Sequence, residues 1–416
     1  MKTKLYIFNE SCFGGLYGIG TYINQIISFF SRNEEVETHI FNIRYNCKEV
    51  IISQGSYPNN HIYYIPEKSH FLNYLYNKEI YYRNIFFILR GFIENNKNNR
   101  FLFFYTNHKY LIESVKQYFG KGKIYFVIHF FPWSLEIKGN TSYFKQIICT
   151  NRKKLKNDKE RNVYDFYKKE ISILKKIDSI ICLSEFAYNT LINIYKVENK
   201  KIWVIYNGIK DEFHRMSLSE KNTIKSNLLF KSNEKILLYV GRLDENKGGK
   251  ELINAFKLLL IEEPDCRLVI IGNGDESIYF EQMQMYWSKI IFSGRLPKEL
   301  IYKFYQIADV GILPSFAEQC SYVAIEMMMH GLPIVGTDST GLSEMIIDGE
   351  NGYKVNLNEN ENDVFLDTVR LSQLIKKIIS NPTLKEYLSQ QSRLIFKNKY
   401  NIEEMKRKYS NLFIAQ

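Results

Sequence analysis

Two glutamates, Glu318 and Glu326, stand eight positions apart around a predicted helix start. The apolar run Val310–Leu313 predicts a buried parallel strand, and the residues after it predict a loop at the carboxyl end of that strand. Ser321 is a good N-cap for a short helix that ends at Gly331. Glu318 then lies in the loop and Glu326 on the helix, near free backbone N–H groups that attract anions. The pair suits a ligand with hydroxyls and phosphates, such as a nucleotide sugar. The alternative is that neither glutamate binds a ligand, and that one is a surface carboxylate and the other a helix-facing one.

Two cations follow another predicted strand, Lys235–Val240. Arg242 and Lys247 fall in the loop at its carboxyl end, before a predicted helix at Glu251–Leu260. Fixed cations beside backbone N–H groups can neutralise a departing diphosphate. This loop is therefore a second candidate element of the same site.

A glycine-rich loop follows the opening strand Lys4–Asn9 and precedes a predicted helix at Thr21–Phe30. Glycines allow the backbone to approach a diphosphate closely, near a helix N-terminus. The spacing differs from the dinucleotide-binding fingerprint, and many α/β proteins begin in this way.

The two charged loops resemble the donor site of the family 4 (group 1) retaining glycosyltransferases of GT-B fold. The matching residues are Glu, seven residues, Glu, then Met-Met-Met-His-Gly-Leu-Pro-Ile-Val, and upstream Val-Gly-Arg-Leu, three residues, Lys-Gly. The resemblance implies that Arg242 and Lys247 hold the donor diphosphate. It also implies that Glu318 lies beside the transferred sugar and that Glu326 binds the ribose hydroxyls. The usual Gly-Phe-Gly after the first glutamate is Gln-Cys-Ser here.

The same resemblance implies further site residues. His129, just past the predicted strand Lys123–Ile128, joins Glu318, Lys247 and Arg242 as a catalytic candidate near the sugar or acceptor; a packed, hydrogen-bonded histidine is the alternative. The further donor contacts that it implies are Gly15 at the phosphates, Arg295 and Leu296 at the base, and Ser321, Tyr322 and Val323 at the helix start.

Alternating strands and helices predict an α/β fold. Besides those given above, predicted strands lie at Thr38–Ile43, Phe101–Tyr105, Ser179–Leu183, Ile202–Ile205, Arg267–Ile271 and Lys289–Phe292. The resemblance implies GT-B architecture: two Rossmann-like domains facing across a cleft, with a C-terminal helix that crosses back to the first domain. We expect an acceptor-side domain at 1–208, completed by 396–416, and a nucleotide-sugar domain at 209–395. Residues 210–232 are expected to form a linker, and residues 134–176 an acceptor-facing loop with a basic helix.

Composition indicates a globular protein, with 45% hydrophobic and 24% charged residues. The six cysteines form no framework, which favours free thiols, and the start of the chain does not resemble a signal peptide. We expect a cytoplasmic protein. The net charge is +11, and residues 151–176 hold ten Lys or Arg against four Asp or Glu. This stretch suits the inner face of an anionic membrane or a phosphate-bearing acceptor, although the lysine-rich composition alone explains it equally well.

The predicted activity is transfer of a sugar from a nucleotide diphosphate sugar to an acceptor hydroxyl, with retention. The acceptor is a glycan, a lipid-linked saccharide or a peptide. We expect no metal, because the carboxylates have no Asp-x-Asp neighbour and the cations can replace a divalent ion, and no cofactor or nucleic-acid partner. The alternatives are a catalytically inactive GT-B partner and a GT-B nucleotide-sugar epimerase; a phosphorylase would need a pyridoxal-binding lysine, and no segment indicates one.

Overall fold

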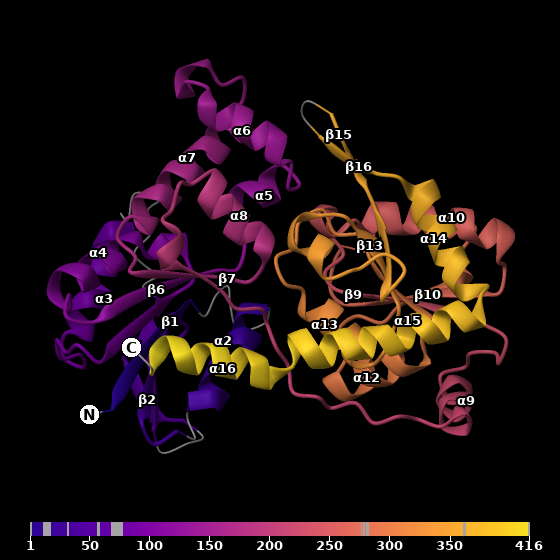
Figure 1. The fold of residues 1–416 in the computed structure, drawn as a ribbon, viewed down its shortest axis with the longest axis horizontal. Helices are drawn as coiled ribbons and strands as arrows, with labels where there is room; N and C mark the ends of the chain where they lie inside the picture. The colour runs from indigo at the N-terminus through magenta and orange to yellow at the C-terminus, as the bar shows by residue number, and fades with distance from the viewer. Residues whose placement is uncertain are drawn as a thin grey trace. The chain divides into compact units, whose positions relative to one another are not determined.

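The chain forms two compact units in the computed structural model (Figure 1). The first unit comprises Met1–His129, Arg152–Ile205 and Met405–Gln416, and the second comprises Phe130–Asn151 and Tyr206–Glu404. The structure describes residues 2–10, 18–30, 33–55, 59–67, 78–275, 277, 279, 283–360 and 363–414. Because the units alternate along the chain, the chain passes from one to the other four times.

The first unit is built on an eight-stranded sheet in which only the edge strand is antiparallel to its neighbour. Across the sheet, the strands are β3 (Ile51–Gln54), β4 (Asn60–Pro66), β2 (Val36–Tyr45), β1 (Thr3–Glu10), β5 (Asn99–Phe103), β6 (Lys123–Ile128), β7 (Ser179–Cys182) and β8 (Ile202–Val204). The last six residues of β1 are all buried, which is typical of a parallel strand covered on both faces.

The helices of the first unit are α2 (Gly18–Phe30), α3 (Lys78–Leu89), α4 (Lys109–Tyr118), α7 (Asp158–Leu174), α8 (Glu185–Asn193) and most of α16 (Ile402–Phe413). Helix α16 is the last of the chain, yet its aromatic side chains pack into this unit. The Phe413 ring lies 4.9 Å from that of Tyr125, and the Tyr409 ring lies 6.2 Å from that of Tyr22. These contacts confirm that the C-terminal helix crosses back to the first domain.

The second unit contains a six-stranded sheet that is parallel throughout. Across it, the strands are β11 (Ile290–Phe292), β10 (Cys266–Ile271), β9 (Lys235–Val240), β12 (Val310–Leu313), β13 (Ile334–Thr337) and β14 (Gly352–Val355). Numbered within the unit, this order is 3-2-1-4-5-6, which is the Rossmann order. Both sheets therefore confirm the predicted pair of Rossmann-like domains.

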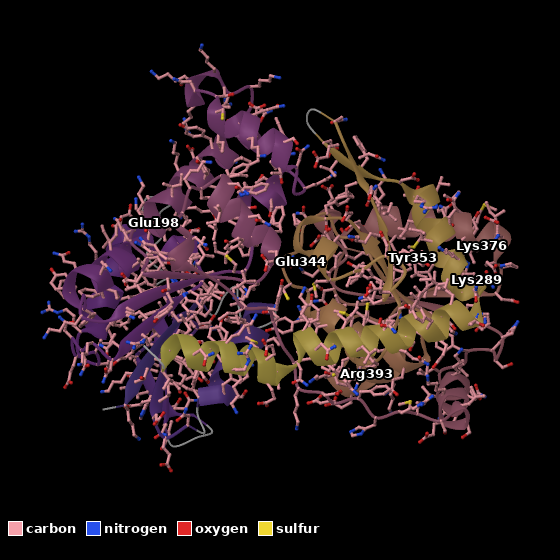
Figure 2. The ribbon with its side chains drawn as sticks, in the orientation of Figure 1. Glu198, Lys289, Glu344, Tyr353, Lys376 and Arg393 are labelled. Carbon is pink, nitrogen blue, oxygen red and sulfur yellow. The ribbon has the colours of Figure 1, made fainter. Side chains whose placement is uncertain are left out.

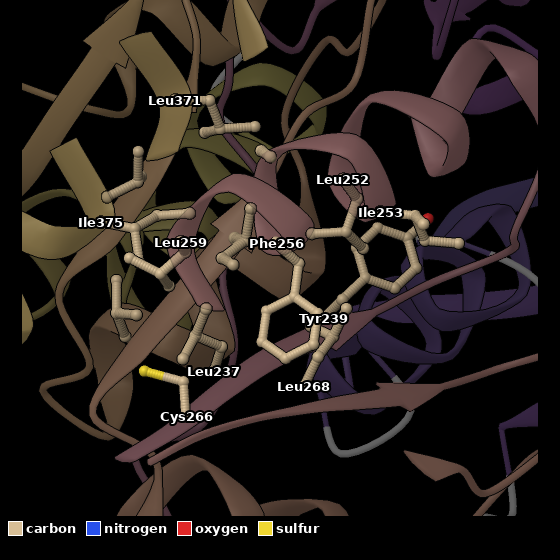
Figure 3. Close-up of a cluster of buried hydrophobic side chains, with 14 of the residues drawn as sticks. Leu237, Tyr239, Leu252, Ile253, Phe256, Leu259, Cys266, Leu268, Leu371 and Ile375 are labelled. Carbon is tan, nitrogen blue, oxygen red and sulfur yellow. The ribbon is translucent and has the colours of Figure 1, made fainter. Parts of the chain in front are cut away.

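The core of the second unit lies between its sheet and two helices, α10 (Gly249–Glu262) and α14 (Thr368–Ile379) (Figure 3). Phe256 and Leu259 of α10 are fully buried in one cluster with Leu237 of β9, and Leu371 of α14 belongs to the same cluster. Apolar residues that recur at helical spacing thus fix both helices to the sheet.

The second unit contains further helices and a hairpin. They are α5 (Pro132–Glu136), α6 (Thr141–Cys149), α9 (Leu218–Asn227), α12 (Lys298–Ile307), α13 (Tyr322–Met329), α15 (Pro382–Ile395) and the hairpin β15 (Leu357–Glu359) with β16 (Val364–Leu366). Arg393 of α15, labelled in Figure 2, pairs with Asp211 at 2.8 Å and fixes the start of the 210–232 segment.

One prediction about this segment was wrong. Residues 210–232 contain helix α9, which starts at a capping box between Ser217 and Glu220. No residue of α9 is buried, so the helix lacks the apolar periodicity by which it could have been recognised.

Candidate active site

The predicted charged loops meet where the strand order of the second sheet reverses. Strands β9 and β12 are adjacent, with Val310 beside Leu237, and their connections lead to opposite sides of the sheet. Ligands of open α/β sheets bind outside the carboxyl ends of the strands at this switch point. The loop with Arg242 and Lys247 follows β9, and the loop with Glu318 follows β12.

Backbone contacts join these two loops. The N–H of Phe316 donates to the carbonyl oxygen of Asn246 at 2.9 Å. Gly248 has a φ of +70°, and a Cβ at this position would lie 2.2 Å from the carbonyl oxygen of Pro314. Only glycine fits such a close approach, so this residue allows Lys247 to stand next to the second loop.

The side chains of Lys247 and Glu318 form an ion pair, in which the ammonium donates to Oε1. Their side chains are 23% and 18% exposed, so the pair is only partly shielded from solvent. In the free protein the cation predicted to hold a diphosphate thus neutralises the carboxylate predicted to lie beside the sugar. An anionic ligand would compete for Lys247 and leave Glu318 free to accept hydroxyl groups.

The backbone of Glu318 is held by Thr340, which sequence reasoning did not identify. The N–H of Glu318 donates to Thr340 Oγ1 at 2.8 Å, and the same hydroxyl donates to the carbonyl oxygen of Glu318. The N–H of Gly341 also donates to that carbonyl, at 2.8 Å. Thr340 has a φ of +32°, which is rare for a β-branched residue and typical of functional sites.

The predicted N-cap and the second glutamate are where the sequence placed them. Ser321 Oγ accepts from the N–H of Ala324 at 3.4 Å and starts helix α13, on which Glu326 lies. The hydroxyl of Tyr305 donates to Glu326 Oε2 at 2.9 Å. Burial raises the pKa of Glu326 to about 7, against the smaller opposing effect of this hydrogen bond. The Tyr305 ring stacks on that of His330 at 5.5 Å.

The other donor-binding candidates of this unit lie around the same loops. Arg242 is 54% exposed, 3.4 Å from Asp244, and Arg295 is exposed after β11. Leu296 is partly exposed, as are Tyr322 and Val323 in the first turn of α13. The role of each residue remains a prediction.

Two candidates belong to the first unit. Gly15 lies outside the described residues. His129 follows β6, its ring packs edge-on against Tyr22 at 4.6 Å, and burial lowers its pKa to about 3, so the imidazole is neutral. Among the residues that the structure describes, Nε2 of His129 has no hydrogen-bond partner. Contact of this ring with a sugar or acceptor remains a prediction.

Neither a cluster of metal-binding side chains nor a membrane-spanning helix is found in the described part of the chain. Within it, His, Cys, Asp and Glu residues nowhere gather in threes in a way that could hold a metal ion. In the same part of the chain, no helix combines the length and the apolar character needed to cross a bilayer.

Solved structures with this arrangement of two Rossmann-like domains define the class of fold. Sucrose-phosphate synthase from Thermosynechococcus elongatus superposes with a TM-score of 0.76 at 18% identity, and the match covers 100% of both chains. Anabaena HepE, solved in complex with UDP and glucose, superposes with a TM-score of 0.70 at 14% identity, also over 100% of both chains. The fold is therefore GT-B.

Sequence comparison identifies the family. Residues 220–395 match the family described as "Glycosyl transferases group 1", and this domain belongs to that family. An uncharacterized glycosyltransferase of Methanocaldococcus jannaschii is 28% identical over 239 residues, which are 56% of this chain and 59% of the relative. The chain thus aligns with less than two thirds of the length of the curated relatives that it matches first.

Proposed function

We propose that this protein transfers a sugar from a nucleoside diphosphate sugar to the hydroxyl of an acceptor, with retention at the anomeric carbon. The observation that carries the proposal is the Lys247–Glu318 ion pair at the switch point of a group 1 glycosyltransferase domain. A cation and a carboxylate here match the two parts of the donor, its diphosphate and its sugar hydroxyls.

In the proposed mechanism, Arg242 and Lys247 bind the diphosphate of the donor. Lys247 moves from the Glu318 carboxylate to a phosphate oxygen, and Glu318 then accepts hydrogen bonds from sugar hydroxyls. Glu326 accepts from the ribose hydroxyls, and Arg295 and Leu296 contact the base. The two cations stabilise the negative charge that develops as the diphosphate departs, and electrostatic stabilisation of this kind usually lowers the barrier more than any other effect.

Retention follows if the acceptor attacks the face that the diphosphate leaves. The bond from the anomeric carbon to the diphosphate oxygen breaks, and the bond to the acceptor oxygen forms on the same face. The departing diphosphate takes the proton of the acceptor hydroxyl, so Glu318 is not a covalent nucleophile. Two cations perform the charge neutralisation that a divalent ion would otherwise supply, and we therefore propose that no metal is required.

The acceptor is a glycan, a lipid-linked saccharide or a peptide. Helix α7 and the residues before it carry exposed basic side chains, among them Lys153, Lys154 and Lys156, which favour an acceptor or surface with negative charge. We propose that the protein works in the cytoplasm and uses nucleotide sugars there as its donors.

A donor screen tests the proposal directly. Because HepE was solved with UDP, UDP-sugars are the first donors to test, followed by sugars on other nucleoside diphosphates. A donor present at 100 times its Kd should raise the free energy of unfolding by about 2.7 kcal/mol, measured as a shift in Tm. Release of free nucleoside diphosphate on addition of an acceptor would establish transfer. If no nucleotide sugar binds, the proposal is wrong.

A further inference from the structure

The turn Lys138–Asn140 comes from a part of the chain to which the sequence assigned no motif. It lies between β6 and α7, both of the first unit, but residues 130–151 fold with the second unit. Inside this segment the rings of Trp133 and Phe144 stack at 4.0 Å, and both side chains are fully buried. The segment is thus a packed part of the domain that holds Glu318.

The backbone of the turn has an uncommon conformation. Lys138 has a φ of +49° and Gly139 a φ of +74°, so two consecutive residues are left-handed. This conformation costs a non-glycine residue roughly 1 kcal/mol or more and persists where surrounding contacts require it. Asn140, which is 2% exposed, follows as the N-cap of α6 and accepts from the N–H of Tyr143 at 2.7 Å.

One side of the turn is tied to the β15–β16 hairpin. Lys138 Nζ pairs with Asp363 Oδ1 at 2.9 Å, and Asn140 Nδ2 donates to the carbonyl oxygen of Asn360 at 3.4 Å. Lys138 Nζ also lies 5.0 Å from the centre of the Phe316 ring. The lysine therefore links the hairpin with the loop that carries Glu318.

The other side of the turn comes close to two groups near the Glu318 backbone. A Cβ at Gly139 would lie 3.0 Å from the carbonyl oxygen of Phe316 and 3.0 Å from Cγ2 of Thr340. Phe316 precedes Glu318 in its loop, and the Thr340 hydroxyl bonds both the N–H and the carbonyl of Glu318. Gly139 thus lies close to the residue that holds this backbone, Thr340, and to the carbonyl of Phe316 in the same loop.

We propose that the turn Lys138–Asn140 is a positioning element for Glu318, which acts through its close packing against Thr340 and the backbone of Phe316. It thereby sets the orientation of the donor sugar without touching the nucleotide. The proposal rests on the proposed glycosyltransferase function for its catalytic consequence but not for its structural one. It predicts that a change in the turn alters sugar transfer and leaves binding of the nucleoside diphosphate intact.

The test compares Gly139→Ala with Gly349→Ala. Gly349 also has a positive φ, +77°, but a Cβ there would meet nothing within 4 Å. The two variants therefore share the backbone cost of alanine, and only Gly139→Ala forces a group against the Glu318 loop. In a second pair of variants, Thr340→Val removes the hydroxyl and Thr340→Ser keeps it. This pair tests the hydrogen bonds between Thr340 and the Glu318 backbone without changing the turn.

Two measurements are needed for each variant. The first is hydrogen exchange at the amides of Glu318 and Gly341, which needs no activity. We expect faster exchange in Gly139→Ala and Thr340→Val and wild-type exchange in Gly349→Ala and Thr340→Ser. The second is kinetics with the donor found in the screen. Misplacement of a reacting group by about 1 Å can cost 10²-fold, so we expect kcat to fall about 10- to 100-fold in Gly139→Ala, while the Kd of the nucleoside diphosphate stays unchanged.

The outcomes separate the two proposals. Equal exchange at Glu318 in Gly139→Ala and Gly349→Ala would overturn the positioning role, and so would a parallel loss of nucleoside diphosphate binding and transfer in Gly139→Ala. If wild-type protein transfers no sugar, the proposed function fails, but the exchange measurements still decide whether the turn fixes Glu318.

Discussion

Replacement of Lys247 by methionine separates its proposed catalytic role from its structural one. Methionine keeps the apolar stem of the side chain and removes the charge. An effective dielectric constant of about 20 suits this partly exposed site. At that value, the charge of Lys247 would interact with a phosphate charge about 4 Å away by about 4 kcal/mol. Only the part that increases as the diphosphate departs affects kcat. Loss of one preorganised electrostatic contact typically costs about 10²–10³ in rate, which is the decrease that we expect.

The expected effect of Lys247→Met on stability is much smaller. The partner side chain, Glu318, is 18% exposed even with the lysine present, so water can solvate the carboxylate that the lysine leaves. Solvent-exposed ion pairs contribute about 1 kcal/mol or less, so we expect only a small loss from this partly exposed one. Lys385→Met is a matched control, because Lys385 Nζ pairs with Asp309 Oδ1 at 2.6 Å in the same unit and its side chain is 33% exposed.

The assay measures kcat and KM for the donor, with Tm as the stability readout, in wild type and both variants. We expect the kcat of Lys385→Met to stay near that of wild type while its Tm falls at least as much as in Lys247→Met, since Asp309 is the more deeply buried carboxylate. An unchanged kcat in Lys247→Met would refute the role of the cation in catalysis. A fall in kcat that is equal in both variants would show that the loss is structural.

Three further predictions concern the same site. Donor affinity, measured by calorimetry, should rise with pH between about pH 6 and pH 8. The reason is that Glu326, whose pKa is raised to about 7, must lose its proton to accept hydrogen bonds from two ribose hydroxyls. Glu326→Gln should remove this pH dependence and leave only the part that comes from titration of the ligand. Transfer should continue in excess EDTA, and loss of turnover that a divalent ion restores would contradict the two-cation mechanism. Proton NMR of the first-formed product should show the anomeric coupling of the donor, whereas an inverted product would refute same-face attack; a glycosyl adduct on Glu318, detected by mass spectrometry, would instead make Glu318 a nucleophile.

The parts of the fold that the sequence predicted are those set by local patterns. Strands Lys235–Val240 and Val310–Leu313 were predicted at their observed ends, because parallel strands buried on both faces are short apolar runs between turn residues. The antiparallel pair β3 and β4 was missed, and three of the four residues of β3 are exposed, so no apolar run marks it. A strand at the edge of a sheet needs no continuous apolar sequence.

The contacts that complete the site could not be predicted, since they join residues far apart in the chain. Tyr305 reaches Glu326 from helix α12, and Thr340 reaches Glu318 from the segment after β13. The sequence Lys138-Gly139-Asn140 is a recognisable turn, but nothing in it indicates that its partner is the loop around Phe316. Turn chemistry specifies local conformation only, and the partner of a turn is decided by tertiary packing.

The two glutamates of the motif are identical in type but lie in different environments, which implies different consequences when a donor binds. Glu318 must exchange the ammonium of Lys247 for the hydroxyl groups of the sugar. Donor binding at this residue therefore depends on charge and weakens as the salt concentration rises. Glu326 is partly buried and accepts a hydrogen bond from Tyr305, and its contact with the ribose depends on the loss of a proton. Two carboxylates in different environments can take separate roles in one site. The two glutamates of one motif thus make a salt-sensitive contact to the sugar and a pH-sensitive contact to the ribose. Lys247→Met should remove only the salt dependence of donor binding, and Glu326→Gln should remove only its pH dependence.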